Sequence, residues 1–265
     1  MIIVSGDSFT DLNYVSQPHP EYDTGYKKWS SYIKNSEHRI VNIGTSGWDN
    51  VSIINGAIEE LFKSQEPVYK IVIALTNWYR FALPHAVVNP DWAYYFKTPE
   101  GAEQMNNTPY MQWLRTQSTY FKENYDFHTE YCKKYSWHVD NDAIINYSSN
   151  QTLFHIIKLY EICKAKNVKL DVFQMLQPIV PRKETSYNFT NALLKNEWFK
   201  KLDKLNSTID KNNFNLIGWP FFENIGGTCA KSLLNIEHKI SHLDEHPNEK
   251  GHMVIGAWYN EHSKI

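Results

Sequence analysis

Short apolar runs alternate with longer segments of helical periodicity along most of this chain. The apolar runs are rich in β-branched residues and predict strands at residues 2–4, 38–43, 69–75, 169–175 and 214–217. Between them, apolar residues recur every three or four positions, which predicts helices at 28–34, 51–63, 152–166, 190–210 and 247–261. Strands that alternate with helices in this way predict an α/β fold with a central parallel sheet.

The alternation breaks between residues 84 and 146. This segment is rich in tryptophan, tyrosine and phenylalanine, and it follows the predicted strand at 69–75. We interpret it as an insertion within a single domain of residues 1–265, lying beside the functional site as a lid or substrate wall. Two roles stay open for its aromatic rings: they build a small core of the insertion itself, or a few exposed faces stack on sugar rings.

Composition and charge narrow the possible functions. A net charge of -2 over 265 residues offers no basic surface for nucleic acid or for an anionic membrane. Three widely spaced cysteines fit neither a disulfide framework nor a structural zinc site, and the chain has no His-Glu-x-x-His pattern, so we expect no metal. It also has no glycine-rich nucleotide-binding motif, so we expect no cofactor. No apolar run is long enough to span a membrane. Because no charged leader precedes the first strand, we expect no signal peptide, and a protein that is cytoplasmic or part of a larger assembly such as a virus particle.

Two short segments near opposite ends of the chain carry candidate catalytic groups. Ser8 follows the first apolar run within Gly6-Asp7-Ser8, at the carboxyl end of a predicted strand, where open α/β sheets bind their ligands. Near the other terminus, Asp244 and His246 stand in the sequence Asp-Glu-His-Pro. A serine hydroxyl is a weak nucleophile unless a base takes its proton, and a third group orients that base. Ser8, His246 and Asp244 therefore form a candidate triad for acyl transfer.

Four short motifs resemble, in the same order, those of the SGNH (GDSL-type) hydrolases: Gly6-Asp7-Ser8-Phe9-Thr10, Asn42-Ile43-Gly44-Thr45-Ser46-Gly47, Leu75-Thr76-Asn77-Trp78 and Asp244-Glu245-His246-Pro247. The resemblance implies a flavodoxin-like three-layer α/β/α fold. It also implies that Ser8 is the nucleophile and His246 the base. The oxyanion hole would consist of the backbone N–H groups of Ser8 and Gly47 and the side-chain amide of Asn77.

The chain departs from that family pattern in two of the motifs. The third motif usually reads Gly-x-Asn-Asp, and here Leu75 and Trp78 replace its glycine and its acid. The fourth usually places its Asp three residues before the His, whereas Asp244 stands two residues before His246. An extended or turning backbone still lets a side chain at this closer spacing reach the imidazole, because residues i and i+2 of a strand share a face.

The sequence also offers candidate substrate contacts and more than one function. Arg80, Trp78 and Trp48 are candidate substrate-binding residues, with pairing to a nearby acid as the alternative for Arg80. The leading hypothesis is a serine esterase that acts on O-acyl groups, chiefly O-acetyl esters of a carbohydrate. One alternative is a weak or inactive SGNH-fold component that binds glycans or serves a structural role. A second alternative is an esterase or thioesterase that acts on lipids or small molecules.

Overall fold

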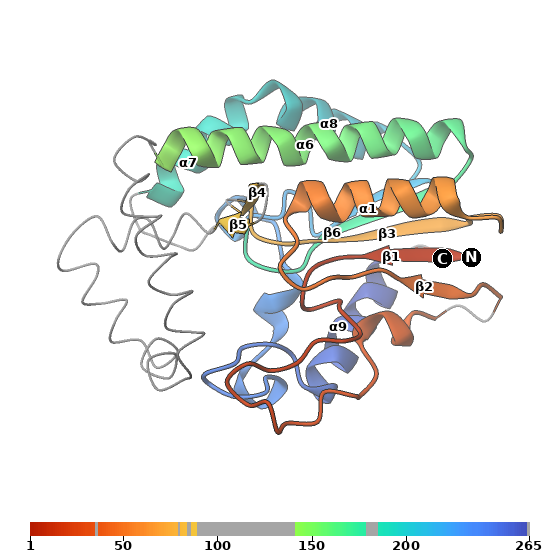
Figure 1. Ribbon diagram of the computed structural model, residues 1–265. Coiled ribbons are helices and arrows are strands. Elements are labelled where there is room, and N and C mark those ends of the chain that lie inside the picture. Colours follow the sequence, from red (N-terminus) through yellow and green to blue (C-terminus); the bar gives the residue numbers. More distant parts are fainter. Residues whose placement is uncertain (35–36, 79, 84–85, 89–140, 179–184, 264–265) are drawn as a thin grey trace.

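A five-stranded parallel sheet forms the centre of the computed structural model, which describes residues 1–265 except 35–36, 79, 84–85, 89–140, 179–184 and 264–265. The sheet has the order β2-β1-β3-β6-β7, with β1 (Ile2–Ser5), β2 (Ile40–Asn42), β3 (Lys70–Leu75), β6 (Lys169–Gln174) and β7 (Phe214–Ile217). Helices α1 (Asn50–Lys63) and α6 (Asn141–Ala165) cover one face, and α9 (Glu249–His262) covers the other (Figure 1). The predicted three-layer α/β/α fold with a central parallel sheet is therefore confirmed.

Shorter elements complete the described part of the chain. Helix α7 (Thr185–Lys195) and helix α8 (Glu197–Thr208) contact each other and α6. Strands β4 (Phe81–Leu83) and β5 (Ala86–Val88) form a small antiparallel pair after β3. Four short 3₁₀ helices, including η1 next to α9, span Trp29–Tyr32, Glu223–Ile225, Ala230–Leu233 and Ile236–His238.

Side chains of the central strands alternate between two separate apolar cores, and this alternation produces the three layers. In β1, Ile3 packs into the core shared with α1, whereas Ile2 and Val4 pack into the core shared with α9. Strand β3 divides in the same way, with Ile71 and Ile73 on the α1 side and Val72 and Ala74 on the α9 side. Burial on both faces explains why these strands appear in the sequence as nearly continuous apolar runs.

Several boundaries differ from those that the sequence pattern predicts. Helix α6 begins at Asn141 rather than near residue 152. The predicted helix at 190–210 is two helices, because Asn196 interrupts it and caps α8 by accepting the N–H groups of Trp198 and Phe199. At the C-terminus, Pro247 precedes the helix rather than opening it, since Asn248 is the N-cap of α9. Most of the predicted insertion at 84–146 lies outside the described residues.

A buried ion pair between the neighbouring strands β3 and β6 is connected by hydrogen bonds to the C-terminal end of α9. The Nζ atom of Lys70 lies 2.8 Å from Oδ2 of Asp171, and the two side chains are 1% and 3% exposed. The same oxygen accepts the hydroxyl of Tyr259 at 2.7 Å and that of Ser263 at 2.6 Å. These donors satisfy a carboxylate that would otherwise be costly to bury. The network therefore anchors the C-terminal end of the helix that follows the His246 segment.

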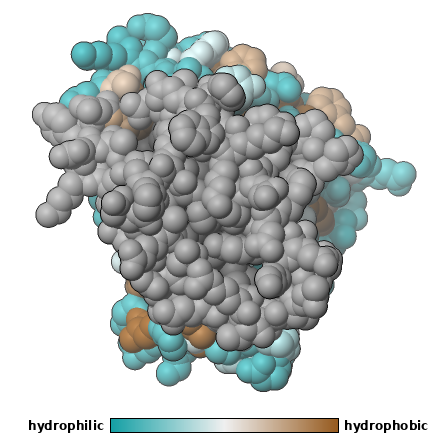
Figure 2. Space-filling view, turned by 60° about the vertical axis from the view of Figure 1, so that its left-hand side comes forward, coloured by the Kyte–Doolittle hydropathy of each residue, from teal (hydrophilic) through white to brown (hydrophobic). Residues whose placement is uncertain are grey.

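On the face seen in Figure 2, the described residues that are visible are mainly hydrophilic, with small separate hydrophobic groups among them. Of the described helices, none is both long enough and apolar enough to cross a bilayer.

Candidate functional site

The chain turns sharply after β1 and presents Ser8 at the carboxyl edge of the sheet. Gly6 is required by space, because a Cβ at this position would lie 2.2 Å from Oγ1 of Thr10. The carbonyl of the buried Asp7 accepts the backbone N–H groups of Thr10 and Asp11, and its Oδ1 accepts the N–H of Phe9. These hydrogen bonds hold the turn from inside, with Ser8 within it.

The structure brings Ser8, His246 and Asp244 into one hydrogen-bonded chain. Oγ of Ser8 lies 2.8 Å from Nε2 of His246, across a sequence separation of 238 residues. On the other side of the ring, Nδ1 lies 2.6 Å from Oδ1 of Asp244. Both distances are those of direct hydrogen bonds. The two ends of the chain therefore meet with the geometry of a nucleophile, a base and an orienting acid.

The environment of Asp244 determines where the protons lie. Burial by itself would raise the pKa of this carboxyl group, but hydrogen bonds and charge from His246, together with the hydroxyl of Ser16, hold the pKa well below its ordinary value. An ionised carboxylate only accepts hydrogen bonds, so Nδ1 of His246 carries a proton directed at Asp244. In the neutral imidazole, Nε2 is then the acceptor for the hydroxyl of Ser8, as a general base requires.

A local turn explains how an acid only two residues before the histidine reaches the ring. Oδ1 of Asp244 accepts the backbone N–H of His246 at 3.0 Å in addition to the ring Nδ1. This is an Asx-type hydrogen bond, which folds the carboxylate back over its own loop. A further residue stabilises this loop: Oγ of Ser241 accepts the backbone N–H groups of Leu243 and Asp244 at 3.0 Å. The shorter spacing is thus compatible with a triad-like contact.

The three predicted oxyanion-hole donors lie on loops at the same edge of the sheet. The backbone N–H groups of Ser8 and Gly47 have no acceptor within the described ranges. Gly47 has a φ of +84°, which favours glycine, and a Cβ there would meet nothing within 4 Å. The amide of Asn77 donates one N–H to the carbonyl of Gln177 at 2.7 Å, which orients the group and leaves its second N–H for another acceptor.

Hydrogen bonds connect these loops to the turn that carries Ser8. Oδ2 of Asp7 accepts the hydroxyl of Thr76, the residue before Asn77, at 2.7 Å. Oδ2 of Asp11 accepts both the backbone N–H and the hydroxyl of Ser46, the residue before Gly47, at 2.9 and 2.6 Å. The segment after β1, which carries Ser8, therefore contacts the neighbours of the other two predicted oxyanion donors, Gly47 and Asn77.

The candidate substrate-binding residues differ in what the structure shows for them. Arg80 lies 3.5 Å from the buried Asp7, so the alternative of pairing with a nearby acid is what the structure shows, and a substrate contact stays a prediction. The prediction for Trp78 is wrong, because its side chain is fully buried and its indole N–H donates to Gln174 at 2.8 Å. Trp48 is half-buried against Gly56 of α1, and its contact with substrate stays a prediction.

Tyr14 is a member of the site that the sequence did not indicate. Its hydroxyl lies 2.8 Å from Oδ2 of Asp244 and 2.8 Å from Nδ1 of His246. Its ring also stacks on the imidazole, with 4.0 Å between ring centroids and 25° between planes. No local pattern singles out this residue, since a tyrosine in a polar loop has no periodicity and its partners lie more than 200 positions away.

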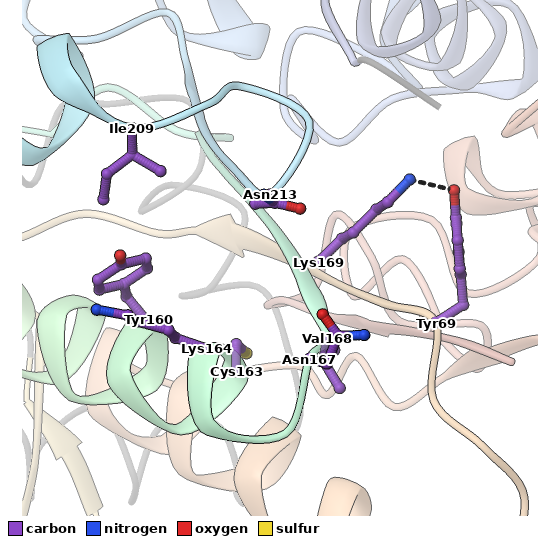
Figure 3. A pocket seen from close by; sticks show the side chains of 9 residues that line it. All are labelled: Tyr69, Tyr160, Cys163, Lys164, Asn167, Val168, Lys169, Ile209 and Asn213. Carbon is purple, nitrogen blue, oxygen red and sulfur yellow. Dashed lines mark hydrogen bonds between the residues drawn. The ribbon is translucent and has the colours of Figure 1, made fainter.

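A cavity of about 330 Å³ lies at the opposite edge of the sheet from this site. Tyr69, Lys169 and Asn213 line it from the starts of β3, β6 and β7 (Figure 3), whereas Ser8 follows the end of β1. The strands are parallel, so the two edges are separated by the length of the sheet. This cavity therefore has no part in the chemistry of Ser8. Within the described ranges, no group of three or more His, Cys, Asp or Glu residues is arranged to hold a metal ion.

His252, in α9 behind the site, gives a pH-dependent prediction for stability. Its side chain is 2% exposed, and its Nδ1 accepts the backbone N–H of Trp29 at 3.2 Å. Burial, followed by the charges of Lys28 and His246, lowers the pKa of His252 to about 3. In the unfolded chain a histidine takes up a proton near pH 6.5, so between about pH 6.5 and 3 only the unfolded state binds it. This group should therefore lower the free energy of unfolding by about 1.4 kcal/mol per pH unit on acidification.

Urea unfolding of the wild type and of His252→Gln, between pH 7 and pH 4, measures this effect. Glutamine offers an oxygen to the N–H of Trp29 and does not titrate. We expect the variant to be less stable at pH 7 but to lose less stability on acidification, so that the two curves converge. Parallel curves over this range would show that His252 is not the group responsible.

Comparisons with known proteins find likeness in structure but not in sequence. No protein-family model matches the chain, and no curated protein matches it. One similar solved structure is a "putative lipolytic protein of G-D-S-L family" from Desulfitobacterium hafniense DCB-2. The match covers 98% of this chain and 97% of the other, at 11% identity and a TM-score of 0.42. At these values the likeness assigns no activity to this chain.

Proposed function

We propose that this protein is a serine esterase that hydrolyses O-acyl esters, with Ser8 as the nucleophile. The observation that carries the proposal is the chain of direct hydrogen bonds from Ser8 through His246 to Asp244. Such an arrangement activates a hydroxyl that is otherwise a weak nucleophile near neutral pH. The charged, buried Asp244 supports the assignment, because it holds the imidazole with a free Nε2 lone pair toward the serine.

The proposed reaction passes through an acyl-serine intermediate. Oγ of Ser8 attacks the ester carbonyl carbon while its proton moves to Nε2 of His246. The bond to the leaving alcohol then breaks, and His246 returns the proton to that alcohol. Water attacks the acyl-serine ester in the same manner, with His246 taking the proton of the water. The carboxylic acid leaves and the hydroxyl of Ser8 is restored.

The charge that develops on the carbonyl oxygen needs donors placed in advance. The N–H groups of Ser8 and Gly47, which have no acceptor in the described part of the chain, are suited to this task together with the amide of Asn77. Loss of one such donor costs about 3 kcal/mol of transition-state stabilisation in serine hydrolases. The positive φ of Gly47 supports the proposal, because it turns the backbone in a way that other residues rarely adopt.

For the substrate, we propose the O-acetyl ester of a carbohydrate. The support is compositional: the segment 84–146, which follows β3 and Asn77, is rich in tryptophan and tyrosine rather than in leucine, isoleucine and valine. Aromatic faces with a polar edge suit sugar rings better than acyl chains. Against this, Leu12 and Val15 are 49% and 59% exposed on either side of Tyr14, and this observation favours the alternative of a longer acyl group.

A substrate series separates these possibilities. We expect p-nitrophenyl acetate to be hydrolysed faster than the butyrate and octanoate esters. We also expect the protein to release acetate from an O-acetylated polysaccharide. A preference for octanoate would instead support the lipid or small-molecule esterase. No turnover of any ester, with glycan binding detected by calorimetry, would contradict the esterase proposal and support the binding component.

A further inference from the structure

We propose that Tyr14 is a positioning residue that holds the imidazole of His246 in line with Ser8 and stabilises its protonated form; this inference rests on the proposed function. Three contacts converge on it. The phenol hydroxyl lies 2.8 Å from Asp244 and 2.8 Å from the ring nitrogen of His246, and the two rings stack. A tyrosine that only filled space would need none of these polar contacts.

The direction of each hydrogen bond follows from the ionised carboxylate. Because Asp244 can only accept, the hydroxyl of Tyr14 donates its proton to Oδ2. The phenol oxygen then faces Nδ1 of His246 as a second acceptor, so the ring N–H is shared between Oδ1 and this oxygen. Tyr14 thereby closes a triangle of acid, phenol and imidazole.

This triangle compensates for the short spacing between the acid and the base. Oδ1 of Asp244 already accepts the backbone N–H of His246, so it serves two donors of the same residue. One point of attachment at Nδ1 leaves the plane of the imidazole free to rotate. The stacked ring of Tyr14 fixes that plane, and Phe9 packs against the same imidazole with ring centroids 4.8 Å apart.

The stacked ring of Tyr14 also interacts with the positive charge that His246 acquires when it is protonated. When Nε2 takes the proton of Ser8, the imidazole becomes a cation lying over the face of Tyr14. An aromatic face attracts such a cation, more strongly where water is excluded. The ring therefore stabilises the state that accompanies bond formation rather than the resting enzyme, and this difference lowers the barrier.

The loop around Tyr14 is held in a way that suits this role. Its carbonyl accepts the hydroxyl of Thr24 at 2.6 Å, while Asp11 ties the start of the loop to Ser46. One loop therefore contacts both the base and the segment that carries Gly47. Its neighbours Leu12 and Val15 point to solvent, so the inward position of Tyr14 is not part of a general apolar core.

Two substitutions separate the hydroxyl from the ring. For Tyr14→Phe we expect kcat for p-nitrophenyl acetate to fall about tenfold, from the lost hydrogen bond to a charged group, with KM unchanged. For Tyr14→Leu we expect a fall of about 100-fold, because the stacked face is lost as well. Tyr22→Phe, a tyrosine of the same loop that is 38% exposed, is the matched control and should keep wild-type kinetics.

The pH dependence of kcat/KM gives a readout that mere packing would not move. In Tyr14→Phe the imidazolium loses the phenol oxygen that accepts from Nδ1, so the acid limb should move to lower pH. In Tyr14→Leu the imidazolium also loses its aromatic face, so the limb should lie at still lower pH. If Tyr14→Leu does not fold, Tyr14→Phe alone decides.

A wild-type kcat and an unmoved acid limb in Tyr14→Phe, with Ser8→Ala inactive, would overturn the role of Tyr14 and leave the esterase proposal standing. Full activity of Ser8→Ala would overturn both. A loss of thermal stability in Tyr14→Phe with unchanged kcat and pH profile would show that the tyrosine has only a structural role.

Discussion

Ser8→Ala should lower kcat/KM for p-nitrophenyl acetate by about 10⁴-fold or more while leaving the fold intact. The substitution removes a single oxygen, whose partner Nε2 of His246 is part of a half-buried ring that water can reach. The folded state therefore loses little. Catalysis loses its covalent route, and what remains comes from the oxyanion donors and substrate binding. Initial rates and a thermal melt of the two proteins measure both sides of this expectation.

Covalent labelling tests the identity of the nucleophile independently of turnover. A fluorophosphonate should modify Ser8 in the wild type and leave Ser8→Ala unlabelled, as found by mass spectrometry of peptides. Ser64→Ala is the matched control, because Ser64 follows α1 near the opposite edge of the sheet, and this variant should still be labelled on Ser8. Labelling of any other residue, or equal rates for Ser8→Ala and the wild type, would contradict the assignment.

Lys70→Met should destabilise the protein by about 3–5 kcal/mol, because it leaves the carboxylate of Asp171 buried without its cationic partner. Tyr259 and Ser263 still donate to that carboxylate, but neither neutralises its charge. Urea unfolding followed by tryptophan fluorescence measures the loss. Since the pair lies away from Ser8, kcat of the folded variant should stay close to that of the wild type.

A double-mutant cycle shows whether the loss comes from the unpaired charge. Lys70→Met with Asp171→Leu removes both charges, and buried pairs replaced by apolar residues are often tolerated. We expect the double variant to be more stable than Lys70→Met alone. Destabilisation equal to the sum of the two single variants would show that the pair is not energetically coupled. Lys63→Met, at an exposed ion pair with Glu59, is the control and should change stability by at most about 1 kcal/mol.

The sheet could be predicted because each of its strands is recognisable from its own run of apolar residues. The run that forms β7 was predicted with its observed bounds, and β3 differs by one residue at its start. A strand buried on both faces is apolar at most of its positions, so its pattern is recognisable without knowledge of its neighbours. Helix α1 was equally accessible, because Asp49 caps it through the N–H of Ser52 and its apolar positions recur at helical spacing.

Helix limits were less predictable where packing rather than local pattern determines them. The first turns of α6 contain a polar stretch around Ser148 and Ser149, so the sequence pattern did not predict a helix there. Both serines are buried in the structure, where packing of α6 against α1 stabilises the helix. The break at Asn196 depends on a capping bond that competes with helix continuation, and both outcomes fit the same residues.

At the candidate site, the sequence motifs indicated which residues to consider, and the fold determined which of them lie close together. Ser8 and His246 could be named because each stands in a short pattern next to a strand or helix end. The sequence could not show which way the side chain of Trp78 points, because a tryptophan after a strand can face a ligand or the core. In the structure it lies in the core, in contact with Gln174 and two phenylalanine rings. Tyr14 could not be found at all.

The amino-acid sequence alone determined an α/β chain with a parallel sheet, a serine after the first strand and a histidine near the end, because each of these is a property of a few consecutive residues. Only the tertiary structure decided that the hydroxyl of Ser8 touches the imidazole of His246, that Asp244 folds back onto the same ring, and that Tyr14 stacks on it. The physical reason is distance along the chain: such contacts depend on how helices and strands pack, and packing energy is shared among residues that no local pattern connects.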